Sequence, residues 1–429
     1  MCSNSADFDK VLAALQIGRE GECWRDGWTQ SQKSFGPEGL FFLNEGFLRE
    51  VCGQLSISAE VCDALIASLD MFQDYPALKR LAWHGHVYLF RSLRDIEEKR
   101  ESFSAWPMLP DRLCEHAPMF YAFVLLSGVR LVRQMHRHQG VPVDITLDTL
   151  SDFELWIRDY RQKAGKWGLI EYGWLSNHFM GQLFRLGRLQ FCFDHFKYDF
   201  HAYRSRHDRR VMLLAGDGMR FRGDGQFDGT TGVHDLKNAW TSEFSAGGGK
   251  IRGSRIAPDG MAVPETVELT ADQWELILQK GDPTLDVHIP AGVPMAHEAC
   301  GESFKRALAF FPRYFPRRPF CAFNSVSWFL DNQFDRMLSE SSNIRRFQRE
   351  VYLYPVPDAY DSQTFERVFG KRFENIDAAP RKTSLQRLIV DHVKSGGHWR
   401  SGGCLLFPED FDWGRQVYRT AQCRGTKGT

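Results

Sequence analysis

The segment from Asp286 to Met295 holds the residues whose types and spacing indicate chemistry, because it leads directly into an expected helix. The first turn of a helix presents unpaired N–H groups and about half a positive charge, which together can hold a phosphate. Gly292 allows a ligand to approach the backbone closely, and Ala296, the expected N-cap, has no side-chain oxygen to satisfy the free donors. The segment therefore indicates a phosphate-binding loop, with a helix start satisfied by water as the alternative.

His288 stands just before this loop, on a short stretch whose apolar residues alternate with polar ones. Leu285, Val287 and Ile289 share one face of the expected strand, so His288 points to the other face. Because the imidazole pKa lies near neutrality, His288 is a candidate general base, and a solvated histidine is the alternative. Asp286 shares its face and can orient the ring, although a surface carboxylate is the plainer interpretation.

Two strands and a helix must position these residues. The stretch Leu285–Ile289 has the period of a strand and is followed by Pro290, which cannot donate to a ladder. A helix with an apolar stripe is expected over His297–Phe311, and a second strand over Phe320–Trp328. The order strand, loop, helix, strand predicts that the two strands are parallel neighbours.

Flanking segments carry local signals of their own. Thr270–Gln273 has the pattern of a capping box, which predicts a helix that ends at Gly281. A short helix is expected over Asp331–Leu338 and a further strand over Ile344–Tyr354. Earlier in the chain, the alternation of Arg188–Phe193 predicts a half-buried strand.

The chain before residue 183 has the periodicity of helices. The expected helices include Met119–Val132, continuing towards Gly140, Ser151–Ala164 and Trp174–Phe184. The change to period two then places a domain boundary near residue 183. We therefore expect an α+β protein, with an all-helical N-terminal domain, residues 1–182, and a strand-containing domain, residues 183–429.

Composition excludes several classes of protein. The 54 basic and 54 acidic side chains cancel, so binding to nucleic acid or to an anionic membrane is not expected. The ten cysteines form no C-x-x-C pair, and no apolar segment suits secretion or a membrane span, so we expect a reduced, cytoplasmic protein. The H-x-H pairs His84/His86 and His136/His138 predict no metal site, because positions i and i+2 diverge on a helix.

Several motifs taken together resemble a known protein family. They are Leu285–Pro294, Glu298–Ser303, Phe310–Pro316, Arg185–Phe191, Ser327–Leu330, Ser342–Phe347 and Thr383–Arg387. The chain resembles bacterial acyltransferase-domain proteins, in which an all-helical N-acyltransferase N-terminal domain precedes a GNAT-like C-terminal domain. The resemblance covers most of the chain after about residue 140 and, more faintly, the helical part before it.

The resemblance implies a mixed central sheet in which two parallel strands splay apart and the pantetheine of an acyl-CoA inserts between them. Carried over by position, the splayed strands are Leu285–Ile289 and Phe320–Trp328, and the pyrophosphate rests on the amides that open the following helix. The implied acyl-CoA-binding residues are Ile289, Ala291, Gly292, Val293, Pro294, Met295 and Ala296. The resemblance implies no metal.

The implied activity is transfer of an acyl group from acyl-CoA to an amine-type acceptor, either a small molecule or a peptide. Such a transfer needs a base for the ammonium and an acid for the leaving thiolate. His288 is the candidate base, and Ser327, Tyr352 and Tyr354 are candidate acids.

The loop departs from the usual GNAT pattern Gln/Arg-x-x-Gly-x-Gly/Ala, because it has only Gly292 and two prolines. An acyl carrier protein is therefore an alternative acyl donor. Two other classes stay open: a non-catalytic sensor of acyl-CoA or nucleotide on the same fold, and a structural protein whose helical half binds a partner.

Overall fold

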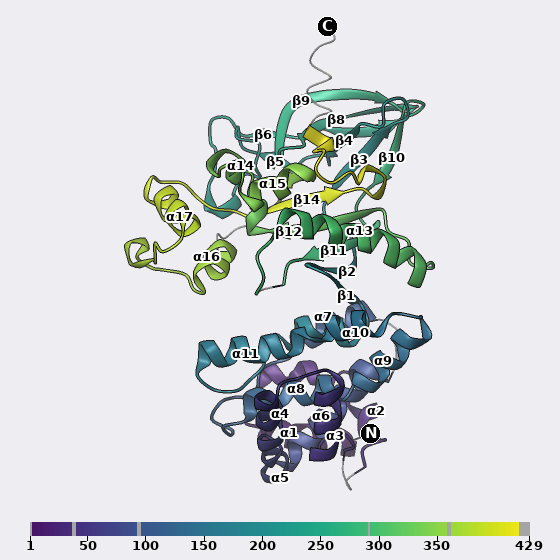
Figure 1. Cartoon of the computed structure of the whole chain (residues 1–429), viewed down its shortest axis with the longest axis vertical. Coiled ribbons are helices and arrows are strands. Elements are labelled where there is room, and N and C mark those ends of the chain that lie inside the picture. Colours follow the sequence, from purple (N-terminus) through teal and green to yellow (C-terminus); the bar gives the residue numbers. More distant parts are fainter. Residues whose placement is uncertain (1, 37–39, 92–95, 291, 358–361, 420–429) are drawn as a thin grey trace. The chain divides into compact units, whose positions relative to one another are not determined.

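The computed structural model describes residues 2–36, 40–91, 96–290, 292–357 and 362–419 (Figure 1). The chain divides into two compact units, Met1–Leu186 and Gly187–Thr429, which we describe separately. In the ranges described, no helix is long and apolar enough to cross a membrane.

The first unit consists mainly of helices. They are α1 (Cys2–Ala14), α2 (Trp28–Gln32), α3 (Glu45–Gln54), α4 (Ala59–Ala67), α5 (Asp70–Asp74), α6 (Pro76–Phe90), α7 (Ile96–Ser104), α8 (Phe120–Leu126), α9 (Val129–His138), α10 (Val143–Leu150), α11 (Asp152–Ala164) and α12 (Tyr172–Phe179), followed by the strand β1 (Leu183–Leu186). One apolar cluster that draws on most of these helices forms the core. The helical character predicted for this part of the chain is confirmed.

One predicted helix of the first unit is interrupted. The stretch Met119–Val132 divides into α8 and α9 at Ser127 and Gly128. A Cβ atom on Gly128 would lie 2.3 Å from the ring of Phe90, so the small residue allows α6 and the start of α9 to approach closely. The expected continuous helix is interrupted there, at Ser127 and Gly128.

The second unit is built on sheets. Its strands are β2 (Leu189–His195), β3 (Phe200–Ser205), β4 (Val211–Ala215), β5 (Arg220–Phe221), β6 (Trp240–Thr241), β7 (Phe244–Gly247), β8 (Lys250–Ala257), β9 (Met261–Thr270), β10 (Trp274–Leu278), β11 (Pro283–His288), β12 (Ala322–Ser327), β13 (Tyr352–Pro355) and β14 (Gly402–Leu406). Its helices are α13 (His297–Tyr314), α14 (Gln333–Met337), α15 (Asn343–Glu350), α16 (Ser362–Phe369) and α17 (Ser384–Lys394), and a 3₁₀ turn, η4 (Trp328–Leu330), follows β12.

The central sheet of this unit contains the order β2-β11-β12-β14-β13. β11 is parallel to β12 and antiparallel to β2, and β14 is antiparallel to both β12 and β13. The predicted crossover from β11 through α13 to a parallel neighbour is therefore confirmed. A second, antiparallel sheet has the order β10-β3-β4-β8-β7, with β9 paired to β8.

α13 lies along one face of the central sheet (Figure 1). It packs there through aromatic side chains. The ring of Phe304 lies 5.1 Å from that of Phe323 on β12 and 5.7 Å from that of Phe191 on β2. Because side chains alternate along a strand, Asp286 and Asn324 point away from α13, to the opposite face of the sheet. The face that carries polar groups is therefore the one that α13 leaves uncovered.

Two local predictions in this unit were wrong. Thr270–Gln273 does not begin a helix: Thr270 ends β9 and Trp274 begins β10, which pairs with β3. Ile344–Tyr354 is not one strand, because Asn343–Glu350 forms α15 and only Tyr352–Pro355 is β13. Both segments are short, and their partners in the fold decide between helix and strand.

Candidate functional site

The parallel strands β11 and β12 stop pairing with each other partway along their length. They pair at Thr284–Ala322, Leu285–Phe323 and Asp286–Asn324. Beyond that point β11 stays bonded to β2 as far as His288, and β12 stays bonded to β14 as far as Ser327. We call the space between Val287–His288 and Ser325–Ser327 the strand gap. The predicted separation of these two strands is confirmed.

One side chain bridges the strand gap near its closed end. The Ser325 hydroxyl donates to the carbonyl oxygen of Val287 at 2.8 Å. A ladder of backbone hydrogen bonds would fill this space, so a single side-chain contact leaves the facing strand edges accessible to an inserted extended group. The gap therefore has the form that an acyl-pantetheine arm requires.

The loop after β11 leads to an uncapped helix start. Gly292 has φ +103°, a conformation that L-residues rarely adopt, and Ala296 provides no side-chain cap for α13. Glu298 lies in the first turn, where its carboxylate accepts from its own backbone N–H and from Arg346. Ala291, one of the predicted acyl-CoA-binding residues, lies outside the described residues.

Arg188 fixes this loop by hydrogen bonds to two of its carbonyl oxygens. Its Nη1 donates to the carbonyl oxygen of Pro290 at 2.8 Å, and its Nε donates to that of Pro294 at 3.2 Å. Its backbone N–H donates to the Ser303 hydroxyl of α13 at 2.9 Å. Arg188 therefore ties β2, the loop and α13 together and places a cation beside a helix start that already favours anions. Sequence reasoning missed this role, since nothing in the pattern around Arg188 distinguishes it from a solvated arginine.

His297, the first residue of α13, fixes the helix start to α15. Arg346 donates to His297 Nδ1 at 3.0 Å, and since arginine is only a donor, Nδ1 accepts and Nε2 carries the hydrogen. That Nε2–H faces Glu350 Oε1 at 3.0 Å. Trp413 donates to the His297 carbonyl oxygen at 2.9 Å. The position of the uncapped amides is thus determined by buried contacts.

The predicted catalytic residues are not brought together. His288 and Ser327 both border the strand gap, but alternation places His288 on the face of Asp286 and Ser327 on the face of α13. Tyr352 is buried, and its hydroxyl donates to the Ile256 carbonyl oxygen at 2.5 Å. Burial raises the pKa of Tyr352, which keeps it a neutral structural donor within the second unit.

Asp286 occupies the position where the two strands separate. Asn324 Nδ2 donates to Asp286 Oδ1 at 2.9 Å, and the Tyr354 hydroxyl donates in turn to Asn324 Oδ1 at 2.6 Å. Burial, and next the negative charge of Asp194, raise the pKa of Asp286 to about 7. The expected surface carboxylate is therefore a partly buried group that titrates near neutrality, and the sequence does not reveal it because its neighbours come from other strands.

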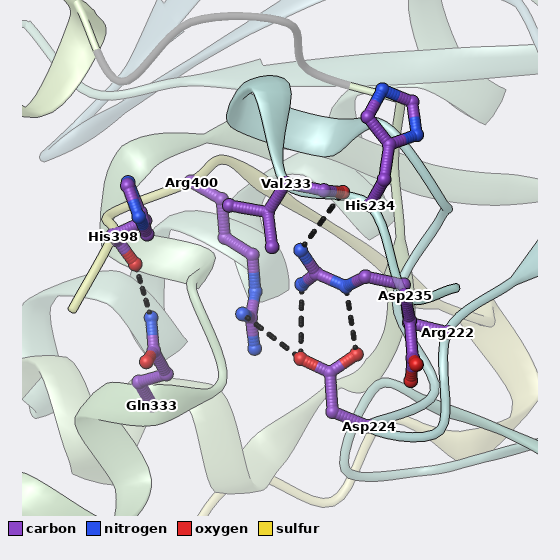
Figure 2. A pocket seen from close by; sticks show the side chains of 8 residues that line it. All are labelled: Arg222, Asp224, Val233, His234, Asp235, Gln333, His398 and Arg400. Carbon is purple, nitrogen blue, oxygen red and sulfur yellow. Dashed lines mark hydrogen bonds and ion pairs between the residues drawn. The ribbon is translucent and has the colours of Figure 1, made fainter. Parts of the chain in front are cut away.

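A separate polar cavity of about 380 Å³ lies between the hairpin at Arg222–Gln226 and the segment before β14 (Figure 2). Asp224 pairs there with Arg222 at 2.9 Å and with Arg400 at 3.7 Å. Arg400 also pairs with the buried Asp331 at 3.6 Å. Since these arginines already face carboxylates of the same chain, the cavity differs from the strand gap, whose strand edges are left for a ligand.

Comparison with known proteins agrees with this geometry. Residues 183–406 match the family described as "GNAT-like C-terminal domain", and residues 46–181 match "N-acyltransferase N-terminal domain". The chain therefore belongs to the family of proteins with a GNAT-like C-terminal domain. A comparison with curated protein sequences gives no match.

Solved structures with the same fold are acyltransferases. One is a mutant acyltransferase in complex with octanoyl-CoA, with 23% identity, a TM-score of 0.66, and coverage of 94% of this chain and 99% of that one. Another is an acyltransferase in complex with decanoyl-CoA and teicoplanin, with 23% identity, a TM-score of 0.65, and coverage of 93% and 98%. At this identity the likeness establishes the fold over nearly the whole of both chains.

Proposed function

We propose that this protein is an acyl-CoA-dependent N-acyltransferase that moves an acyl group from acyl-CoA to an amine on a small-molecule or peptide acceptor. The observation that carries the proposal is the strand gap, because β11 and β12 stop pairing at Asp286–Asn324 while each stays bonded to its other neighbour. An acyl-pantetheine arm inserted there completes the backbone pairing that the two strands lack.

The helix start next to the gap supports the same donor. The predicted acyl-CoA-binding loop, Ile289 to Ala296, ends at the uncapped amides of α13, and Arg188 adds a positive charge beside it. A pyrophosphate satisfies such donors. The loop follows β11, which borders the strand gap, so one ligand can place its nucleotide at the loop and its thioester in the gap.

The acceptor class is part of the proposal. One of the acyltransferases with this fold was crystallised with teicoplanin, a glycopeptide, so a compact molecule with a free amine is the acceptor that we favour. An acyl carrier protein as donor is not supported by any contact described above.

Calorimetric titration with acetyl-, octanoyl- and decanoyl-CoA tests donor binding, and thiol release in the presence of an amine panel that includes teicoplanin tests transfer. We expect binding with a preference among chain lengths, and thiol release that depends on the amine. Binding without thiol release for any amine would identify a sensor instead, and absence of binding would remove the acyl-CoA assignment altogether.

A further inference from the structure

A second carboxyl group lies beside Asp286 on the face of the central sheet opposite α13. Asp194 on β2 is the diagonal neighbour of Asp286, since Asp194 pairs with Thr284 and Asp286 pairs with Cys192. Two carboxylates at neighbouring positions repel each other, so one of the pair holds its proton more tightly than an isolated carboxyl group does.

The surrounding contacts decide which group holds that proton. Asp194 accepts from the Lys197 ammonium at 2.9 Å and from the His195 backbone N–H at 2.8 Å, and both contacts favour its ionised form. Asp286 lies nearer the sheet interior and receives only neutral donors, from Asn324 at 2.9 Å and Thr284 at 3.4 Å. The more tightly held proton therefore belongs to Asp286.

Tyr354 on β13 lies on the same face as Asp286, and burial raises its pKa, so it stays neutral near pH 7. Cys404 on β14 lies on the other face, paired with Ser325, and burial raises its pKa as well. Lys197 is the cation that faces the pair, and it is bonded to Asp194. His288 follows two residues later on the same face of β11. Asp286 is thus the carboxyl group of this set that can both give and take a proton at neutral pH.

We propose that the Asp194–Asp286 carboxyl pair is the acid–base group of this enzyme, with Asp286 as the catalytic residue and Asp194, on the neighbouring strand, as the positioning residue. The inference rests on the proposed function, because it needs an amine and a thioester in the strand gap. Asp286 marks the closed end of that gap, and the same face of β12 is open at Val326, which is 36% exposed.

The proton balance of the reaction follows from this assignment. The Asp286 carboxylate accepts one proton from the acceptor ammonium, and the neutral amine attacks the thioester carbonyl carbon. As the carbon–sulfur bond breaks, the second nitrogen proton leaves to solvent, and protonated Asp286 returns its proton to the thiolate sulfur. The products are an amide, free CoA thiol and one released proton, and the carboxyl pair is regenerated.

Asp286→Asn and Asp194→Asn test the two roles separately, with Glu275→Gln, an exposed acid on β10, as the matched control. With decanoyl-CoA and benzylamine, which is protonated at neutral pH, Asp286→Asn lowers kcat at least 100-fold while decanoyl-CoA affinity changes less than about threefold. With aniline, which is already neutral, the loss is at least tenfold smaller. Asp194→Asn instead shifts the midpoint of the pH–rate profile to lower pH, because the negative neighbour is gone.

Infrared difference spectra give a readout that does not depend on turnover. We expect the carbonyl stretch of a protonated carboxylic acid near pH 6 in the wild-type protein, its loss on raising the pH through about 7, and its absence in Asp286→Asn. Equal loss of kcat with both amines, an unmoved pH midpoint in Asp194→Asn, or no such band would each overturn the carboxyl pair. If the band is present but no amine gives thiol release, the proposed function fails while the raised pKa of Asp286 stands.

Discussion

Asp286 shows how one residue couples the chemistry of the site to the stability of the fold. Its pKa of about 7 lies above the value of 3.8 that an unperturbed carboxyl group has. Between those two pH values the folded chain holds a proton that the unfolded chain has lost. The free energy of unfolding therefore falls as the pH rises from about 4 to about 7, and the loss is complete above the folded-state pKa.

Asp286→Asn removes this pH dependence. From about pH 5 to about pH 8 the free energy of unfolding of the wild type should fall by roughly 2–3 kcal/mol through this group. We expect the variant to lack this fall. Urea unfolding of wild type and variant at both pH values measures the difference, and Glu275→Gln provides the control for loss of a carboxylate. A variant with the wild-type pH dependence would contradict the raised pKa.

For Tyr352 we expect a substitution to change stability and not catalysis, because its hydroxyl is hydrogen-bonded in the protein interior. It donates to the Ile256 carbonyl oxygen and accepts from the Leu213 backbone N–H. Tyr352→Phe leaves both groups unsatisfied and should lower the free energy of unfolding by about 1–3 kcal/mol. We expect kcat for acyl transfer to stay within about twofold of wild type at a temperature where the variant is folded, because no acid is lost from the strand gap. A large fall in kcat would restore Tyr352 as a candidate acid.

At the scale of elements, the conformation of the loop before α13 depends on the contacts of Arg188, which we call the clamp, rather than on the sequence of the loop itself. Arg188 bonds the carbonyl oxygens of Pro290 and Pro294, so Arg188→Ala removes both hydrogen bonds and a positive charge near the helix start. We expect the Kd for decanoyl-CoA to rise by about 10–100-fold, with a weaker effect at high salt for the charge component.

The control for this prediction is Arg306→Ala, on α13 itself. Arg306 is exposed and pairs with Glu302 within the helix, so its removal should leave the Kd nearly unchanged. Calorimetric titration of the three proteins separates the two arginines. Equal effects of both substitutions would mean that general positive charge, and not the clamp, determines donor affinity.

The sequence predicts elements well where the signal is contained in the element itself. α13 and β2 follow from their own periodicity, and the β11–α13–β12 crossover follows from the order of those elements. The capping-box pattern at Thr270–Gln273 fails because the same local hydrogen bonding also serves turns, and here Asp272 accepts from Thr270 between β9 and β10. α15 is helical because Arg345 and Arg349 reach Asp335 and Arg346 reaches Glu298, contacts that no local pattern contains.

The candidate site also has one part that the sequence predicts and one part that it does not. The strand gap and the uncapped helix start were predictable, since they depend on contiguous residues around Gly292 and on the order of the elements. The Asp194–Asp286 pair was not, because 92 positions separate the two carboxyl groups and only the antiparallel register of β2 with β11 makes them neighbours. Sequence spacing therefore located the strand gap and the helix start, whereas His288, Ser327 and Tyr352 stay predictions as proton-transfer groups.

At the scale of the whole molecule, each of the two compact units has apolar clusters of its own. Proteins built from separate cores often unfold in more than one step, so ligand binding can identify the unit that holds the ligand. The proposed donor site uses residues of the second unit only, from Arg188 to Ser327. Decanoyl-CoA should therefore stabilise the second unit directly.

At a free decanoyl-CoA concentration of about 100 times Kd, we expect the free energy of unfolding of the second unit to rise by about 2.7 kcal/mol. Hydrogen exchange measured by mass spectrometry should then slow in peptides from β11, β12 and the first turn of α13, where the arm and the pyrophosphate add hydrogen bonds. Decanoic acid, which has the same chain without the nucleotide, should leave these peptides unchanged. Protection confined to the first unit would place the donor elsewhere, because backbone amides exchange more slowly only where binding removes their opening or satisfies their N–H groups.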